Sequence, residues 1–199
     1  MLDPFYLIVD SSAWLARLLP VGVKLVQLRI KDQSDDIVRA EVRAAKALCA
    51  AHGAQLVVND YWRIAIEEGC DFIHLGQEDL ADADAAAIRA AGCRLGVSTH
   101  DHRELDLALA VEPAYIALGP VFPTILKQMT WAPQGLDRVA EWKAAVGNVP
   151  LVAIGGLTPD RGRAVLDAGA DSAAVVTDVL RHADPEARAR EWIAATRQR

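Results

Sequence analysis

The chain has 199 residues, of which 52% are hydrophobic and 24% are charged, and its formal net charge at pH 7 is -6. This length is typical of one domain, so we expect residues 1–199 to form a single domain. The acidic balance argues against nucleic-acid binding and against attachment to a membrane through a basic patch.

The N-terminal residues MLDPFYLIVD lack the basic region and cleavage site of a signal peptide. The longest apolar runs are too short to span a bilayer. The cysteines, Cys49, Cys70 and Cys93, form no paired motif and are expected to be small buried apolar side chains. These features together predict a cytoplasmic protein.

One unit recurs along the chain, in which a helical stretch ends at a glycine and a short apolar strand follows. AAHGAQLVVND and LDAGADSAAVV are two examples. Glycine closes a helix readily because it adopts the left-handed conformation at low cost. Strands that are apolar throughout are typical of parallel strands buried on both faces. We predict strands, in chain order, at residues 5–9, 23–30, 54–59, 71–75, 94–98, 114–118, 150–154 and 172–176.

Helical patterns lie between these strands. Ser34 and Thr158 are expected to cap two of the helices, and Pro159 suits the first turn of the second. Eight repeats of strand and helix predict an α/β fold, a single-domain (β/α)8 TIM barrel. The alternative is a doubly wound open sheet, which usually has fewer strands and often a glycine-rich first turn. The predicted helices cover residues 34–53, 82–92, 136–147, 158–169 and 184–199.

In such a barrel the active site lies at the C-terminal ends of the strands. The second strand ends in VQLRIKD, and the alternation of a strand would put Gln27, Arg29 and Lys31 on one face. Polar and cationic side chains facing a barrel mouth favour a polar or anionic ligand. Alternatively, Arg29 pairs with a core carboxylate and Lys31 lies in solvent.

Carboxylates follow the third and fourth strands. Asn59 and Asp60 end VVND, and Asp79 follows Gly76 in HLGQEDL. These residues could cap the helices that come next. Two carboxylates at neighbouring strand ends, facing cations, also suit Mg²⁺ that is bound together with substrate phosphates. We therefore predict Mg²⁺ as the cofactor.

The remaining strand ends carry hydroxyl groups, a lysine and glycines. Ser98 and Thr99 end the fifth strand, and Thr124 and Lys127 follow the sixth. Glycine-rich ends of the seventh and eighth strands, each leading into a helix, are a common phosphate site in barrels. Two anion sites in one mouth predict transfer of a group from its diphosphate, with Mg²⁺ assisting, to a second phosphorylated molecule.

These motifs resemble, in order and spacing, those of the thiamine-phosphate synthase family. The resemblance extends from Val26 to Thr177. The ordered set is specific, although single motifs such as the Gly-Gly tip occur in many phosphate-binding barrels. The motifs are VQLRIKD, VVNDYWRIA, FIHLGQEDL, LGVSTH, YIALGPVFPT, PLVAIGGLTP and GADSAAVVT.

The resemblance implies coupling of 4-amino-5-hydroxymethyl-2-methylpyrimidine diphosphate to hydroxyethylthiazole phosphate or its carboxylated form. The products would be thiamine monophosphate and diphosphate. It implies Asp60 and Asp79 as Mg²⁺ ligands. The catalytic residues that the resemblance implies would all contact the pyrimidine diphosphate. They are Arg29, Lys31, Ser98 and Lys127. The further substrate contacts would be Gln27, Asn59, Thr124, Gly156, Val176 and Thr177.

Leu126 departs from the family pattern, which usually has Thr-x-Thr-Lys where this chain has Thr124-Ile125-Leu126-Lys127. Because leucine cannot donate a hydrogen bond, we expect weaker binding of the thiazole phosphate. Three alternatives are a related thiazole tautomerase, a non-catalytic ligand-binding paralogue, and another sugar-phosphate isomerase. The expected partners are small-molecule substrates, and a homo-oligomer is compatible with the sequence.

Overall fold

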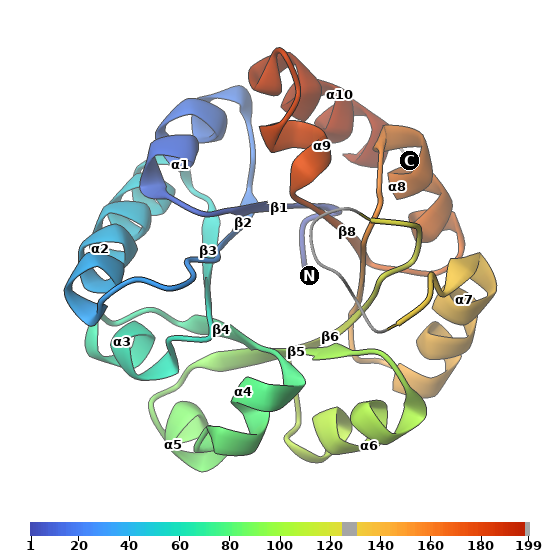
Figure 1. The fold of residues 1–199 in the computed structure, drawn as a ribbon, viewed down its shortest axis with the longest axis horizontal. Helices are drawn as coiled ribbons and strands as arrows, with labels where there is room; N and C mark the ends of the chain where they lie inside the picture. The colour runs from blue at the N-terminus through green and yellow to red at the C-terminus, as the bar shows by residue number, and fades with distance from the viewer. Residues whose placement is uncertain (125–130, 198–199) are drawn as a thin grey trace.

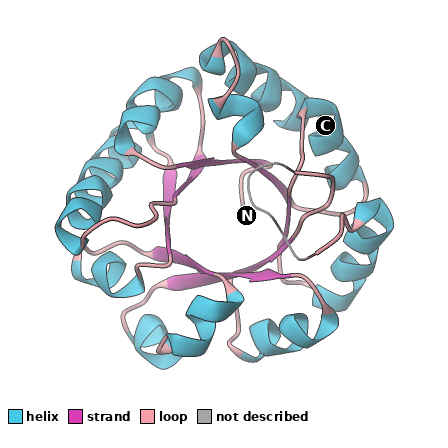
Figure 2. Ribbon diagram, in the orientation of Figure 1, coloured by secondary structure: helices cyan, strands magenta, loops and turns pink. Residues whose placement is uncertain are grey.

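The computed structural model describes residues 1–124 and 131–197. Eight parallel strands pair in chain order, and the last pairs with the first, so the sheet closes into a barrel. A ring of helices surrounds the strands (Figures 1 and 2). The predicted barrel is therefore confirmed, and the open sheet is excluded. The strands are β1 (Phe5–Val9), β2 (Leu25–Leu28), β3 (Gln55–Asn59), β4 (Phe72–Leu75), β5 (Arg94–Thr99), β6 (Tyr115–Leu118), β7 (Leu151–Ile154) and β8 (Ser172–Val175).

The helices follow the strands in the predicted alternation, with two corrections. Ser34 stands at the N-cap position of its helix, but its side chain makes no capping hydrogen bond. The segment predicted as one helix over residues 82–92 contains the end of one helix and a second short helix, because Ala83 has an extended backbone between them. The Asp84 side chain then caps the second helix by accepting from the Ala87 N–H at 2.9 Å. The helices are α1 (Ser12–Leu18), the 3-10 helix η1 (Leu19–Val21), α2 (Asp35–His52), α3 (Trp62–Glu67), α4 (Gln77–Asp82), α5 (Ala85–Ala90), α6 (His102–Ala110), α7 (Gly135–Val146), α8 (Pro159–Asp167), α9 (Thr177–Leu180) and α10 (Pro185–Arg197).

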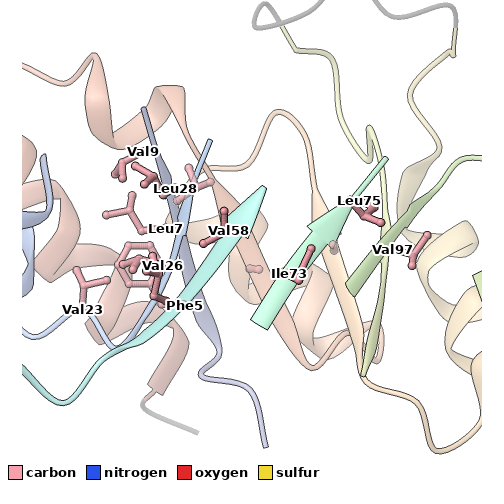
Figure 3. Packing of buried hydrophobic residues seen from close by; sticks show 14 of the residues in the cluster. Phe5, Leu7, Val9, Val23, Val26, Leu28, Val58, Ile73, Leu75 and Val97 are labelled. Atoms are coloured by element: carbon pink, nitrogen blue, oxygen red, sulfur yellow. The ribbon is translucent and has the colours of Figure 1, made fainter. Parts of the chain in front are cut away.

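The side chains of each strand alternate between two hydrophobic cores. One set, which includes Leu7, Val26 and Ile73, points outward and packs beneath the helices (Figure 3). The other set, which includes Tyr6 and Tyr115, fills the barrel interior. This parity follows from the two-residue period of a strand and decides which residues can reach the barrel mouth.

Gly96 makes room for a large aromatic ring inside the barrel. A Cβ atom at this position would lie 2.1 Å from the Tyr115 ring, closer than any real contact. The Tyr115 ring is fully buried and also packs edge-on against Phe72, with ring centroids 5.5 Å apart. The glycine on β5 therefore allows a tyrosine from β6 to cross the interior.

The two ends of the chain meet where the barrel closes. Trp192 of α10 stacks on Phe5 of β1, with ring centroids 5.5 Å apart. The Arg197 guanidinium pairs with the Asp3 carboxylate at 3.0 Å, and the Ser172 hydroxyl donates to the Asp3 carbonyl at 2.7 Å. The last helix thus covers part of the outer face of the first strand.

Candidate functional site

A pair of carboxylates lies at the C-terminal ends of β3 and β4. The Asp60 side chain accepts from Lys31 and is hydrogen-bonded to the Asp79 carboxyl group. Burial, followed by the nearby Asp60 charge, raises the pKa of Asp79 above its ordinary value. The structure therefore brings together three of the predicted site residues.

The local backbone explains how this pair is held. Asp60 has a left-handed backbone with φ of 65°, and its N–H donates to the His74 carbonyl at 2.9 Å. Asp79 lies inside α4, and its carboxylate leans over Gly76, where a Cβ atom would be 3.3 Å away. Neither α3 nor α4 has a side-chain cap, so the alternative interpretation of these residues as helix caps is wrong.

An acidic cavity of about 270 Å³ opens beside the pair. Within residues 1–124 and 131–197, no three His, Cys, Asp or Glu side chains cluster as a metal cage. Two carboxylates are nevertheless a suitable donor set for Mg²⁺, which usually keeps waters and binds substrate phosphates as well. The residues therefore fit a Mg²⁺ ion completed by a phosphorylated ligand. The cavity is lined by Asp35, Asp60, Tyr61, Trp62, Arg63, Ile64, Asp79 and Asp82.

The two cationic residues after β2, Arg29 and Lys31, are arranged differently from the prediction. Because β2 ends at Leu28, Arg29 and Lys31 lie in the following loop and not on a strand face with Gln27. Arg29 is half-buried, with its N–H bonded to the Val9 carbonyl at 2.8 Å, and in the described part of the chain no carboxylate pairs with it. Lys31 turns to Asp60 while its side chain stays 47% exposed, so the alternative is wrong for the core-paired arginine but not for the solvent-exposed lysine.

Five side chains form a hydrogen-bonded chain across the barrel interior. Gln27 Nε2 donates to the Tyr6 hydroxyl at 3.0 Å, which is 3.0 Å from the Tyr115 hydroxyl. Tyr115 is 2.7 Å from His74 Nδ1, and His74 Nε2 is 2.8 Å from Ser98 Oγ. We call these five residues the interior chain. Burial lowers the pKa of His74 to about 4, so the ring is neutral near pH 7.

The two hydroxyl groups that end β5 have different surroundings. The Ser98 side chain joins the interior chain, and its carbonyl accepts from Gln77 Nε2 at 2.7 Å. Thr99 lies on the opposite face, where its hydroxyl donates to the Ala117 carbonyl at 3.0 Å and accepts from Trp142 Nε1 at 2.9 Å. The prediction that Thr99 offers a hydroxyl to the mouth is therefore wrong. Its fully buried hydroxyl instead anchors α7.

The backbone of the segment that follows β6 packs against the two glycines at the end of β7, Gly155 and Gly156. The Val121 N–H donates to the Ile154 carbonyl at 2.9 Å, and the Phe122 N–H donates to the Gly155 carbonyl at 3.0 Å. Gly156 has a φ of 64°, and a Cβ atom there would lie 2.3 Å from the Pro123 carbonyl oxygen. Close approach of two backbones therefore requires glycine here, in addition to any role toward a phosphate.

The other predicted contacts of the thiazole substrate lie around the same mouth. Thr124 is partly exposed at the end of the described segment after β6, while Leu126 and Lys127 lie outside the described residues. β8 ends at Val175, and Val176 immediately precedes the first residue of α9, Thr177.

The two predicted polar contacts of the pyrimidine diphosphate, Gln27 and Asn59, are buried. They are 3% and 5% exposed, which places both inside the rim.

Sequence reasoning gave no role to three members of the interior chain, Tyr6, His74 and Tyr115. Each is a polar ring in a short strand that is otherwise apolar. That pattern is the available signal, because a buried hydroxyl or imidazole needs a hydrogen-bond partner.

Comparison with known proteins places the chain among enzymes of one kind. Residues 5–179 match the family model described as thiamine monophosphate synthase. The chain is 67% identical over 195 residues to the thiamine-phosphate synthase of Rhizobium etli, covering 98% of this chain and 96% of that protein. It is 52% identical over 193 residues to the thiamine-phosphate synthase of Salmonella dublin, covering 97% of this chain and 88% of the relative.

A solved structure agrees with these matches. The thiamine phosphate pyrophosphorylase from Pyrococcus furiosus superposes with a TM-score of 0.87 and 25% sequence identity, covering 98% of this chain and 95% of that one. Separately, no helix in the described part of the chain is both long and apolar enough to cross a membrane.

Proposed function

This chain belongs to the thiamine monophosphate synthase family, and we propose that it makes thiamine monophosphate from a pyrimidine diphosphate and a thiazole phosphate. The pyrimidine substrate is 4-amino-5-hydroxymethyl-2-methylpyrimidine diphosphate. The acceptor is hydroxyethylthiazole phosphate or its carboxylated form, and the carboxylated form must also lose its carboxyl group as CO2 to give the same product. The observation that carries the proposal is the carboxylate pair Asp60–Asp79, with Lys31 beside it at the barrel mouth.

The carboxylates of Asp60 and Asp79 would hold Mg²⁺ together with oxygens of the diphosphate. Bound Mg²⁺ would neutralise negative charge that grows on the diphosphate as it departs. Burial, followed by the nearby Asp60 charge, raises the pKa of Asp79, and a bound cation would favour the ionised form. The donor set therefore supports a Mg²⁺-assisted reaction.

The cationic side chains would stabilise the leaving group. The C–O bond to the diphosphate breaks and its electron pair leaves with the diphosphate oxygen. The lone pair of the thiazole nitrogen then forms the new C–N bond to the pyrimidine methylene carbon. Fixed positive charge and hydroxyl donors suit this reaction, because negative charge develops on the departing oxygen. The proposed diphosphate contacts are Arg29, Lys31, Ser98 and Lys127.

The remaining predicted residues would place the two organic groups. Gln27 and Asn59, both buried inside the rim, would position the pyrimidine diphosphate. Thr124 would contact the thiazole substrate. Gly156 and the backbone of Val176 and Thr177 would receive its phosphate, since backbone N–H groups at strand ends commonly bind phosphate in barrels.

A coupled assay tests the proposed function. Purified protein with both substrates and Mg²⁺ should release diphosphate and form thiamine monophosphate in equal amounts. Omission of either substrate should abolish diphosphate release. Isomerised thiazole without coupling would instead indicate the tautomerase, and binding without any product would indicate the non-catalytic paralogue.

We expect Leu126→Thr to improve use of the thiazole phosphate. A threonine hydroxyl can donate a hydrogen bond that leucine cannot. A hydrogen bond to a charged group contributes about 1.5–3 kcal/mol, so the KM for the thiazole phosphate should fall roughly tenfold or more. Steady-state kinetics with each substrate varied in turn measures this effect. A KM for the thiazole phosphate that stays the same in Leu126→Thr and in the matched Leu126→Val variant would refute the expectation.

A further inference from the structure

The interior chain links five strands beneath the site and ends at Ser98. Its members come from β2, β1, β6, β4 and β5, in the order in which the hydrogen bonds run. The successive donor–acceptor distances are 3.0, 3.0, 2.7 and 2.8 Å. All five side chains lie inside the barrel, and four of them are nine-tenths or more buried. The members are Gln27, Tyr6, Tyr115, His74 and Ser98.

The amide of Gln27 sets the direction of every bond in the chain. Because Gln27 Nε2 donates to the Tyr6 oxygen, the Tyr6 proton is free to donate to Tyr115. The Tyr115 proton then donates to His74 Nδ1, so the neutral ring carries its proton on Nε2. His74 Nε2–H donates to Ser98 Oγ, which leaves the Ser98 proton for a partner at the mouth.

The opposite hydrogen-bond direction would leave the Tyr6 hydroxyl proton without an acceptor. If Ser98 donated to His74, each bond would reverse, and Tyr115 would donate to Tyr6. The Tyr6 oxygen would then accept from both Tyr115 and Gln27, and in the described structure its own proton would have no acceptor. A buried hydroxyl without an acceptor is destabilising.

We propose that the interior chain is a one-way relay of hydrogen bonds that fixes Ser98 as a donor to the diphosphate of the pyrimidine substrate. Tyr6, Tyr115 and His74 are then positioning residues for the reaction, because they act through Ser98 and do not touch substrate. An anion accepts hydrogen bonds and cannot donate, so a serine whose proton already points to the mouth binds it without reorganisation. This inference rests on the proposed role of Ser98 as a diphosphate contact.

The ¹⁵N chemical shifts of His74 test the direction without any substrate. In protein labelled with ¹⁵N-histidine near neutral pH, Nδ1 should resonate as an unprotonated nitrogen and Nε2 as a protonated one. The His74→Gln variant identifies the signals by their loss. The opposite assignment, with the proton on Nδ1, would overturn the relay even if the enzyme makes thiamine monophosphate.

An isosteric exchange should reverse the relay. In Gln27→Glu the donor at the start of the chain becomes an acceptor, so Tyr6 donates to it and each later bond reverses. His74 should then carry its proton on Nδ1, and the two ¹⁵N shifts should exchange. A Gln27→Glu protein that keeps its fold by circular dichroism but retains the wild-type tautomer would contradict the proposal. Because this readout is spectroscopic, a failed coupled assay would leave it intact.

Breaking the chain should affect one substrate only. Tyr115→Phe keeps the ring beside Gly96 but removes the hydroxyl, so kcat/KM for the pyrimidine diphosphate should fall about tenfold while the KM for the thiazole phosphate stays the same. Thr196→Val, which removes a fully buried hydroxyl on α10 outside both the interior chain and the acidic cavity, is the matched control and should match wild type. Equal loss for both substrates, or no loss, would refute the positioning role. If Tyr115→Phe does not fold, Tyr6→Phe tests the same break one bond earlier.

Discussion

Replacement of Asp60 with Asn should lower turnover at least about a hundredfold with little change in the fold. The variant removes one of the two proposed Mg²⁺ ligands and the partner of Lys31. A metal that stabilises the leaving group contributes several kcal/mol, and each 1.36 kcal/mol is a factor of ten in rate. Asn is preferable to Ala because residue 60 has a φ of 65°, which Asn adopts more readily.

Two further carboxylate variants distinguish loss of a proposed Mg²⁺ ligand from loss of negative charge elsewhere on the cavity. Asp79→Asn should cause a similar loss, whereas Asp82→Asn, an exposed residue on the same cavity, should retain activity. Diphosphate release should be measured across a Mg²⁺ titration, with thermal melting as the check on folding. Full turnover by Asp60→Asn would overturn the metal assignment.

Gly96→Ala should destabilise the barrel by about 3 kcal/mol, the upper part of the usual range for overpacking a core. The added methyl group would overlap the Tyr115 ring, whose nearest atoms are 2.1 and 2.3 Å away. The ring cannot move aside easily, because it is fully buried and packs against Phe72 and His74. Urea unfolding followed by circular dichroism measures the change in free energy.

A double-mutant cycle tests the stated cause. Tyr115→Leu removes the distal ring atoms that the new methyl group would meet, so the combined Gly96→Ala/Tyr115→Leu protein should be more stable than the sum of the single effects predicts. Strict additivity would show that the ring is not the obstacle. A change below about 0.5 kcal/mol for Gly96→Ala alone would contradict the packing described for the interior.

Most of the fold could be predicted from the sequence, because each strand and helix is specified locally. Apolar runs, most of them after helix-ending glycines, locate every strand, and their number predicts the closed barrel. The ends of strands were less certain. Ile30 continues the apolar alternation of β2, so nothing local indicates that the strand stops at Leu28 and that Arg29 and Lys31 belong to a loop.

Site residues that lie at the ends of strands could be predicted from the sequence. Contacts between side chains that are far apart in the sequence could not. Asp60 and Asp79 could be placed together because neighbouring parallel strands end at one rim. Alternation along β5 also predicts that Ser98 and Thr99 face opposite sides of the strand, although it does not say which of them faces the interior. The contact between Tyr6 and Tyr115 could not be foreseen, because 109 positions separate them and only barrel closure brings them together.

The contact between the last helix and the first strand bears on how the protein is synthesised. Phe5 belongs to the first strand of the barrel and is covered by Trp192 of α10, so the outer face of β1 stays uncovered until α10 has been made. The nascent chain therefore carries an exposed apolar strand until α10 emerges. Such transiently exposed surfaces are prone to aggregate. Burial of β1 therefore waits for α10, and nascent chains that stop before α10 are the form most in need of a chaperone.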